Sequence, residues 1–248
     1  MDGSPIAIEA AGLKKSYGAV QVTRDVSFAL PSGTALGIIG PNGAGKTTLF
    51  NLLTGTVRAD GGTVRFFGQD ITSRDARARS GMGIARSFQV PQPFGGLTVF
   101  ENALVAATFG QNLSEAAARP IAVDALRRTG LLSKATKRAG ELGLLDRKRL
   151  ELTRSIATAP KLLLLDEIAG GLTDAECADL IDLILSIKAS GVTIIWIEHV
   201  LHALLRVVDR VMVLDFGQKI AEGEPQAIMQ SPGVAAIYLG LEPEVEHV

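Results

Sequence analysis

The sequence has little cysteine and no long hydrophobic run. Its 248 residues include one cysteine, Cys177, which excludes a disulfide framework or a multi-cysteine zinc site within the chain. The longest apolar stretches are residues 162–165 and 192–197, much shorter than the roughly 20 residues of a membrane-spanning helix. The first residues lack the basic flank and apolar segment of a signal peptide. We therefore expect a cytoplasmic chain that reaches a membrane only through a partner.

Net charge is also close to zero. The chain has 25 basic and 26 acidic side chains, whereas a general nucleic-acid binder normally carries a strong positive excess. We therefore predict no nucleic-acid partner. Hydrophobic residues make up 47% of the sequence, which is enough for a buried core and excludes a disordered chain. The length predicts one large domain, or a core with a subdomain.

Short apolar segments bounded by turn residues predict β-strands toward both ends of the chain. Residues 161–166 and 193–198 are apolar on both faces, which is typical of parallel strands covered by helices. The alternation of strands and helices predicts an α/β fold with a mainly parallel sheet, whereas residues 6–30 predict small antiparallel strands. The other expected strands or hairpins are residues 34–40, 62–71, 210–214 and 218–221, and the expected helices include residues 44–53 and 175–189.

Residues 92–157 have a different pattern. Apolar residues recur there at helical spacing and β-branched runs disappear, so we expect a helical subdomain inserted into a core of residues 1–91 and 158–248. Residues 111–160 contain ten basic and five acidic side chains. Such an excess is typical of a solvated helix surface, and a contact surface for a partner is the alternative.

A phosphate-binding sequence lies between a predicted strand and a predicted helix. Residues 40–47 fit the pattern G-x-x-x-x-G-K-[ST]. Glycines let backbone N–H groups approach phosphates, and the following helix adds the positive end of its dipole. Lys46 would pair with the β- and γ-phosphates, and the Thr47 hydroxyl would take a Mg²⁺ position. The residues expected to bind ATP here are Gly40, Pro41, Asn42, Gly43, Ala44, Gly45, Lys46, Thr47 and Thr48.

Two carboxylates follow the apolar strand of residues 162–165. Ligands of open α/β sheets bind beyond the carboxyl ends of the strands, so Asp166 and Glu167 are expected at the same edge as the phosphate loop. Asp166 would hold Mg²⁺ through water, and Glu167 would act as a base or orient the attacking water. The alternative, a surface acidic pair at a strand end, is common in isolation but weak beside a phosphate loop.

With these motifs the chain resembles the ATP-binding subunits of ABC transporters over nearly its whole length. The resemblance implies one cassette, residues 1–248, with a P-loop NTPase core, an N-terminal antiparallel β subdomain and the inserted helical subdomain. It implies ATP and Mg²⁺ as cofactors and ATP hydrolysis coupled to transport. The implied partners are transmembrane permease subunits and a second ATP-binding subunit, with a solute-binding protein acting indirectly. The implied location is the cytoplasmic face of the inner membrane.

The resemblance also implies roles for residues outside the phosphate loop. Tyr17 lies where the family has an aromatic ring that stacks on adenine. Gln89 matches a glutamine that contacts Mg²⁺ and the attacking water and links the core to the helical subdomain. Glu167 matches the catalytic glutamate, and His199 matches a histidine that contacts the γ-phosphate. Alone, Tyr17 and His199 would be ordinary residues of a strand edge and a strand end.

One motif departs from the family pattern. The signature loop, typically L-S-G-G-Q, corresponds here to Leu142, Gly143, Leu144, Leu145 and Asp146. In the family this loop offers a hydroxyl and N–H groups to the γ-phosphate held by the opposite subunit of a dimer. Two leucines would obstruct that approach, and the aspartate would face a phosphate of like charge. This predicts an asymmetric dimer with a partner that has an intact signature. A divergent loop that works through backbone N–H groups alone is the alternative.

Within the family, the sequence is similar to the ATP-binding subunits of branched-chain amino acid importers. The similarity rests on residues 88–89, 97–102, 169–172, 197–199 and 213–217, together with 237–240. Related subunits serve urea, amides or aromatic acids, and substrate choice belongs to other subunits.

Two other functions stay open from sequence. A soluble ABC-type ATPase of nucleic-acid repair or translation would usually carry a coiled-coil insertion, a second cassette or a basic tail, and none is evident. A regulatory nucleotide binder is disfavoured by the intact Glu167.

Overall fold

The computed structural model describes residues 4–232 and residue 234. Residues 237–240, part of the similarity noted above, lie outside the described residues. The N-terminal sheet has the order β2-β1-β4-β5, and all its pairs are antiparallel. The prediction of an antiparallel N-terminal part is confirmed, although β1 and β2 are longer than the small strands expected. The strands are β1 (Ile6–Tyr17), β2 (Val20–Pro31), β4 (Gly61–Phe66) and β5 (Gln69–Asp70).

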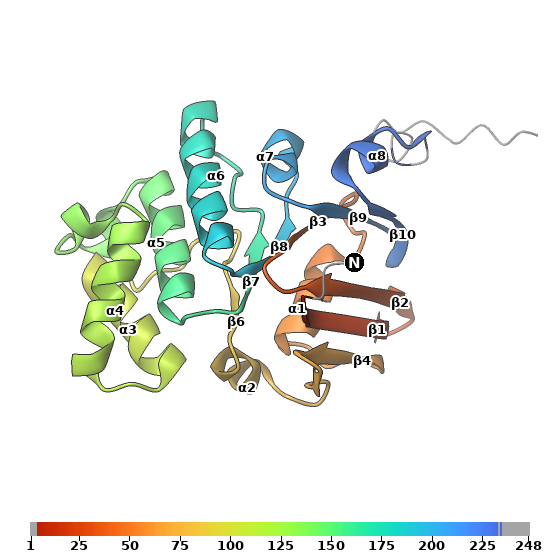
Figure 1. Cartoon of the computed structure of the whole chain (residues 1–248), viewed down its shortest axis with the longest axis horizontal. Helices are drawn as coiled ribbons and strands as arrows, with labels where there is room; N and C mark the ends of the chain where they lie inside the picture. Colours follow the sequence, from red (N-terminus) through yellow and green to blue (C-terminus); the bar gives the residue numbers. More distant parts are fainter. Residues whose placement is uncertain (1–3, 233, 235–248) are drawn as a thin grey trace, which may run out of the picture.

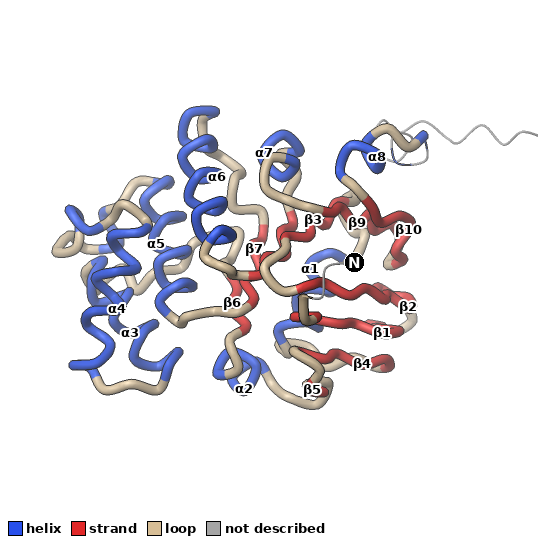
Figure 2. The backbone as a smooth tube through the Cα atoms, viewed as in Figure 1, coloured by secondary structure: helices blue, strands red, loops and turns tan. Residues whose placement is uncertain are grey.

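The second sheet has the order β10-β9-β3-β8-β7-β6 and is parallel except for the β9–β10 hairpin. Every residue of β3, β7 and β8 is buried, which explains why their sequences are apolar on both faces. Figure 2 shows these strands running through the middle of the molecule. The strands are β3 (Ala35–Ile39), β6 (Ile84–Arg86), β7 (Leu162–Asp166), β8 (Thr193–Ile197), β9 (Arg210–Asp215) and β10 (Gln218–Gly223).

Strand register brings the two predicted motifs to one edge of this sheet. Ile197 at the end of β8 pairs with Ile38 on one side and with Asp166 on the other. The phosphate loop follows β3 directly and Glu167 follows β7. The two motifs therefore leave the same edge with one strand between them, as expected for an open α/β sheet.

Three helices form a group of their own at one side of the molecule (Figure 1). They are α3 (Val99–Gln111), α4 (Glu115–Arg128) and α5 (Leu144–Ala157). An apolar cluster that includes Val99, Leu126 and Leu150 packs among them. Two larger clusters contain the residues of the central strands. The other α-helices of the described residues are α1 (Lys46–Thr54), α2 (Ala76–Gly81), α6 (Asp174–Ala189), α7 (Leu201–Leu205) and α8 (Pro225–Met229), and two 3₁₀ helices, Leu132–Lys134 and Ala139–Glu141, precede α5.

Helix starts follow the local sequence. α6 begins with a capping box in which the Thr173 side chain and Glu176 bond each other's backbone N–H groups. The helix expected from residue 44 begins only at Lys46, because its N-cap Gly45 has a φ of 97°, in the left-handed region. Over the part of the chain that the structure describes, no helix combines the length and apolar character needed to cross a membrane.

Candidate active site

The loop between β3 and α1 forms one wall of a hollow of about 190 Å³. Gly40 and Gly45 have φ values of 152° and 97°. A Cβ on Gly40 would lie 2.1 Å from the Leu214 carbonyl oxygen, and one on Gly45 would lie 2.6 Å from that of Val22. Only glycine fits at these positions, so the loop is held tightly between β9 and β2. The hollow is lined by Val22, Asn42, Gly43, Ala44, Gly45, Lys46, Thr47, Thr48 and Glu167.

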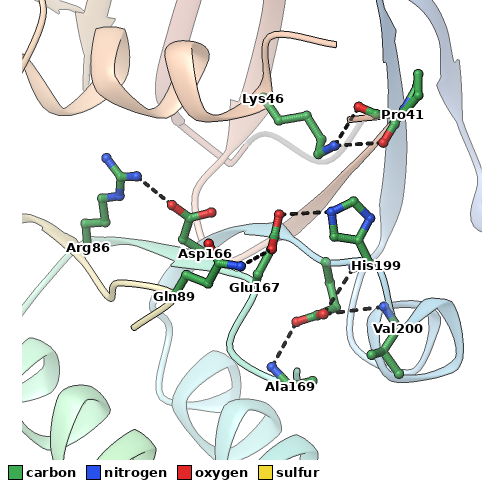
Figure 3. Close-up of polar contacts among 11 residues, drawn as sticks. Pro41, Lys46, Arg86, Gln89, Asp166, Glu167, Ala169, His199 and Val200 are labelled. Atoms are coloured by element: carbon green, nitrogen blue, oxygen red, sulfur yellow. Dashed lines mark hydrogen bonds and ion pairs between the residues drawn. The ribbon is translucent and has the colours of Figure 1, made fainter. Parts of the chain in front are cut away.

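The Lys46 ammonium group lies over this loop. Its Nζ donates hydrogen bonds to the carbonyl oxygens of Gly40 (2.7 Å) and Pro41 (2.9 Å) (Figure 3). Burial lowers the pKa of Lys46, while the charges of Glu167 and Asp166 act in the opposite direction. A bound anion would stabilise the protonated form of this lysine, because an opposite charge nearby favours the charged state.

Glu167 lies between Gln89 and His199, and each of these side chains contacts one oxygen of its carboxylate (Figure 3). Gln89 Nε2 donates to Oε2 at 2.6 Å, and His199 Nε2 lies 2.9 Å from Oε1. The backbone of Glu167 has a φ of 46°, a conformation that costs roughly 1–3 kcal/mol for a residue other than glycine and is concentrated at functional sites. The structure thus brings all three predicted catalytic residues together.

The carboxylate of Asp166 has a partner that the sequence analysis missed. Arg86 Nη2 lies 2.5 Å from Asp166 Oδ2, and the two side chains are only 10% and 8% exposed. The only feature of the sequence that could have indicated this ion pair is the single arginine at the end of the short apolar segment Ile84–Arg86. Only the parallel pairing of β6 with β7 places that arginine near the end of the neighbouring strand.

A second missed residue, Glu198, holds the loop that follows Glu167. This carboxylate is 2% exposed. Its Oε2 accepts a hydrogen bond from the Ala169 N–H at 3.0 Å, and its Oε1 accepts one from the His199 N–H at 3.1 Å. Glu198 therefore connects the backbone beside His199 to the loop beside Glu167.

A third missed residue, Lys148, reaches the same loop from α5. Its buried Nζ donates to the carbonyl oxygens of Ile168 (2.6 Å) and Gly170 (2.7 Å). Burial lowers the pKa of Lys148. The helix that begins at the predicted signature segment is thereby tied to the loop after Glu167.

Tyr17 has no hydrogen bond or ion pair with the catalytic residues in the described part of the chain. It ends β1, is half exposed, and has Lys15 Nζ at 5.6 Å from its ring centroid. It is not among the residues that line the hollow, so its place on adenine stays a prediction.

The divergent signature segment lies at the start of α5. Gly143 is the N-cap, Leu142 is buried, and Leu144 is 46% exposed. Asp146 forms an ion pair with Lys134. The negative charge of Asp146 thus has a partner within the same chain, and the approach of this aspartate to a phosphate of the opposite subunit stays a prediction.

The donor set at the sheet edge fits Mg²⁺. The predicted ligands are the Thr47 hydroxyl, the Asp166 carboxylate and the Gln89 amide oxygen, and Mg²⁺ prefers such hard oxygen donors. Gln89 uses its amide nitrogen on Glu167. The amide oxygen of Gln89 is not the atom that bonds Glu167, so the hydrogen bond to Glu167 leaves this oxygen able to act as a ligand.

Comparison with known proteins agrees with this geometry. Residues 23–170 match the ABC transporter family. The chain belongs to this family. It is 35% identical over 246 residues to the high-affinity branched-chain amino acid transport ATP-binding protein LivG of Escherichia coli (strain K12), covering 92% of this chain and 96% of LivG. It is 33% identical to the corresponding protein BraF of Pseudomonas aeruginosa, with 94% and 97% covered.

A solved structure of the ADP conformation of MJ1267, an ATP-binding cassette of an ABC transporter, superposes with a TM-score of 0.87. It is 32% identical and covers 95% of this chain and 99% of its own. A nucleotide-free cassette from an ABC transporter gives a TM-score of 0.86 at 31% identity, with 94% and 98% covered. The predicted fold of an ABC cassette and its assignment as an ATPase are confirmed at the level of the family.

Proposed function

We propose that this ABC cassette is the ATP-hydrolysing subunit of an importer for branched-chain or related amino acids. One observation carries the catalytic part of the proposal. Glu167 lines the hollow formed by the phosphate loop, and both its carboxylate oxygens are held, one by Gln89 and one by His199. Such a carboxylate is positioned to orient a water molecule and accept its proton, the role of a general base.

Different side chains around this hollow would bind the phosphates of ATP and the Mg²⁺ ion that accompanies them. Lys46 would move from the carbonyls of its own loop to the β- and γ-phosphates, and the start of α1 would face them with its positive dipole end. Bound Mg²⁺ would neutralise the phosphate charge, held by Thr47, Asp166 and Gln89. His199 would contact the γ-phosphate. Hydrolysis then depends on how well these side chains are positioned.

A second hollow, of about 420 Å³, is our candidate contact for a permease subunit. It lies between the core, at α2 and β6, and the helical group, at α3 and α5. Three of its lining residues, Phe88, Phe94 and Phe109, are 51%, 49% and 80% exposed. Large exposed aromatic residues are typical of protein interfaces. Because Phe88 adjoins Gln89, movement of a partner here would reach the catalytic residues.

The similarity to LivG and BraF supports the amino-acid part of the proposal, since both are named as branched-chain amino acid transport proteins. We further propose that the chain lies on the cytoplasmic face of the inner membrane beside a second ATP-binding subunit, and that a solute-binding protein delivers cargo to the permease. Export is a second candidate. The chain is 37% identical over 231 residues to the Nod factor export ATP-binding protein I of Rhizobium sp. (strain N33), covering 92% of this chain and 74% of that protein.

Transport in vesicles tests the proposal. The chain is reconstituted with its permease subunits and its second ATP-binding subunit, ATP is supplied on its side of the membrane and the solute-binding protein on the other, and labelled leucine, isoleucine and valine are followed. ATP-dependent uptake that is lost with Glu167→Gln is expected. ATP-dependent release toward the other side would support export instead. Hydrolysis that moves none of these amino acids in either direction would overturn the assigned substrate class.

A further inference from the structure

Arg86 joins the phosphate-loop helix to the carboxylate predicted to hold the metal. Its Nη2 donates to Asp166 Oδ2 at 2.5 Å and its Nη1 donates to Asn51 Oδ1 at 2.6 Å. Asn51 is on α1, four residues after Thr47, so the two residues lie on the same face of the helix one turn apart. The guanidinium fork therefore fixes the spacing between Asp166 and the helix that carries the Thr47 hydroxyl.

Two aromatic rings hold Arg86 in turn. Its Cζ lies 5.5 Å from the ring centroid of Phe50 and 5.2 Å from that of Phe88. Phe50 is fully buried, whereas Phe88 is half exposed and lines the 420 Å³ hollow. Contacts of a guanidinium with aromatic rings contribute about 0.5–1 kcal/mol at exposed sites and more where water is excluded. One support of Arg86 is thus internal, and the other is at the candidate permease contact.

A contribution to folding stability does not by itself explain the buried ion pair of Arg86 and Asp166. A buried ion pair often contributes no more than a well-packed apolar pair, because removing both charges from water is costly. Arginine cannot lose its charge to relieve that cost. The pair is better explained by the orientation it gives to Asp166, since hydrogen-bonded partners of metal-binding carboxylates set metal affinity.

We propose that Arg86 is a positioning residue for the predicted magnesium carboxylate Asp166, and that Phe88 makes this positioning sensitive to occupation of the neighbouring hollow. The proposal rests on the proposed function. Arg86 occupies Oδ2 and so leaves Oδ1 for a metal-bound water. Phe88 braces the guanidinium from the side on which a partner would dock.

Two effects of the Arg86 charge oppose each other at this site. A positive charge beside Asp166 weakens the attraction of that carboxylate for a cation, whereas the fork keeps the carboxylate in place. The predicted contact of Asp166 with Mg²⁺ runs through water, and the phosphates supply most of the negative charge that attracts the ion. Orientation then matters more than charge, and loss of Arg86 weakens metal binding.

The test measures metal binding without turnover. In the Glu167→Gln background, Mn²⁺ binding to the ATP complex is followed by electron paramagnetic resonance for Arg86→Met and Arg86→Lys. We expect metal binding about tenfold weaker or more for Arg86→Met, and an intermediate loss for Arg86→Lys, which keeps the charge but not the fork. ATP binding measured with EDTA present should be unchanged.

Matched controls come from the same hollow. Arg154 also lies near an aromatic ring, 5.3 Å from Phe94, and pairs with Glu151 at 2.9 Å. Arg154→Met should leave Mn²⁺ binding unchanged. Phe88→Ala should weaken it a few-fold, and Phe109→Ala should leave it unchanged.

Unchanged or tighter Mn²⁺ binding in Arg86→Met would overturn the proposal, because Arg86 would then be structural or a competitor of the metal. If Arg86→Met does not fold, Arg86→Lys and Phe88→Ala decide, and wild-type metal binding in both would overturn it. Failure of the unaltered chain to bind ATP would instead contradict the proposed function.

Discussion

At the scale of single residues, Glu167 has a carboxylate that is held on both of its oxygens. Its left-handed backbone and its contacts with Gln89 and His199 fix where the carboxylate points. Replacing Glu167 with Gln keeps the shape and removes the base. We expect ATP binding to persist while hydrolysis falls by about 10²–10⁴-fold, the usual contribution of a positioned general base. Phosphate release and binding of a fluorescent ATP analogue measure the two effects.

A surface carboxylate serves as the control for this substitution. The Asp182 side chain is 72% exposed, and its Oδ1 lies 3.7 Å from Arg206 Nη2. Asp182 does not line the hollow at the phosphate loop. Asp182→Asn should leave both measurements unchanged. Fast turnover in Glu167→Gln would refute its role as the base.

Site residues whose role depends on a short local motif could be predicted from the sequence. Residues whose role depends on a partner far away in the sequence could not. Gly40, Gly45 and Lys46 are recognisable because one short loop requires those residue types in that order. Arg86 and Asp166 are 80 positions apart, and their ion pair exists only because β6 lies beside β7. No local pattern encodes that pairing, and the same holds for Lys148, whose partners are carbonyl groups of another loop.

At the scale of elements, the connection from α5 to the loop after Glu167 depends on one buried ammonium group. Lys148→Met would leave the carbonyls of Ile168 and Gly170 without this donor. We expect a loss of about 1–3 kcal/mol in the free energy of unfolding, the cost of leaving a buried polar group such as the Ile168 carbonyl unsatisfied. Urea denaturation measures it. Arg149→Met is the neighbouring control, since Arg149 pairs with a mostly exposed Asp179 and such pairs contribute roughly 1 kcal/mol or less. Equal losses would contradict the role of Lys148.

Lys148 also predicts how stability changes with pH. Burial lowers its pKa in the folded protein below the usual 10.5, despite the opposing charges of Glu198 and Cys177. Between the folded and unfolded values the unfolded chain binds more protons, so the free energy of unfolding rises as pH rises through that window. Urea denaturation across the alkaline range below 10.5 should show a smaller rise in Lys148→Met than in the unaltered chain. Identical pH dependence would contradict the buried, shifted Lys148. The comparison of the two proteins cancels the common contribution of Lys46, whose pKa burial also lowers.

Most elements were predictable, and the exceptions have physical reasons. β7 and β8 are apolar except at Asp166, which ends β7, and Thr193, which begins β8, so composition marks both strands. α2 and β6 are six and three residues long, too short for a hydrophobic period to be recognised. The start of α1 was placed two residues early because the left-handed φ of Gly45 depends on the contact of its loop with β2.

At the scale of the whole molecule, the chain has an ordered site of its own but a divergent signature surface. Leu144 is 46% exposed at the start of α5, and it stands where the signature pattern L-S-G-G-Q has a glycine. We infer that this chain works with a second ATP-binding subunit whose signature is intact, and that the site containing Glu167 does most of the hydrolysis.

Mutations in a mixed dimer locate the working site. The chain alone should hydrolyse ATP slowly, and adding a partner with an intact signature should raise turnover on the order of 10²-fold, comparable to gaining one set of donors to a developing charge. Glu167→Gln in this chain should abolish that gain, whereas the equivalent change in the partner should have a smaller effect.

Restoring the signature sequence tests the same inference in this chain alone. Changing Gly143→Ser, Leu144→Gly, Leu145→Gly and Asp146→Gln together should raise its turnover. Asp146→Gln by itself controls for loss of the pair with Lys134 and should not. Strong turnover by the unaltered chain alone would show instead that its signature segment works through backbone N–H groups, and the inferred asymmetry would be wrong.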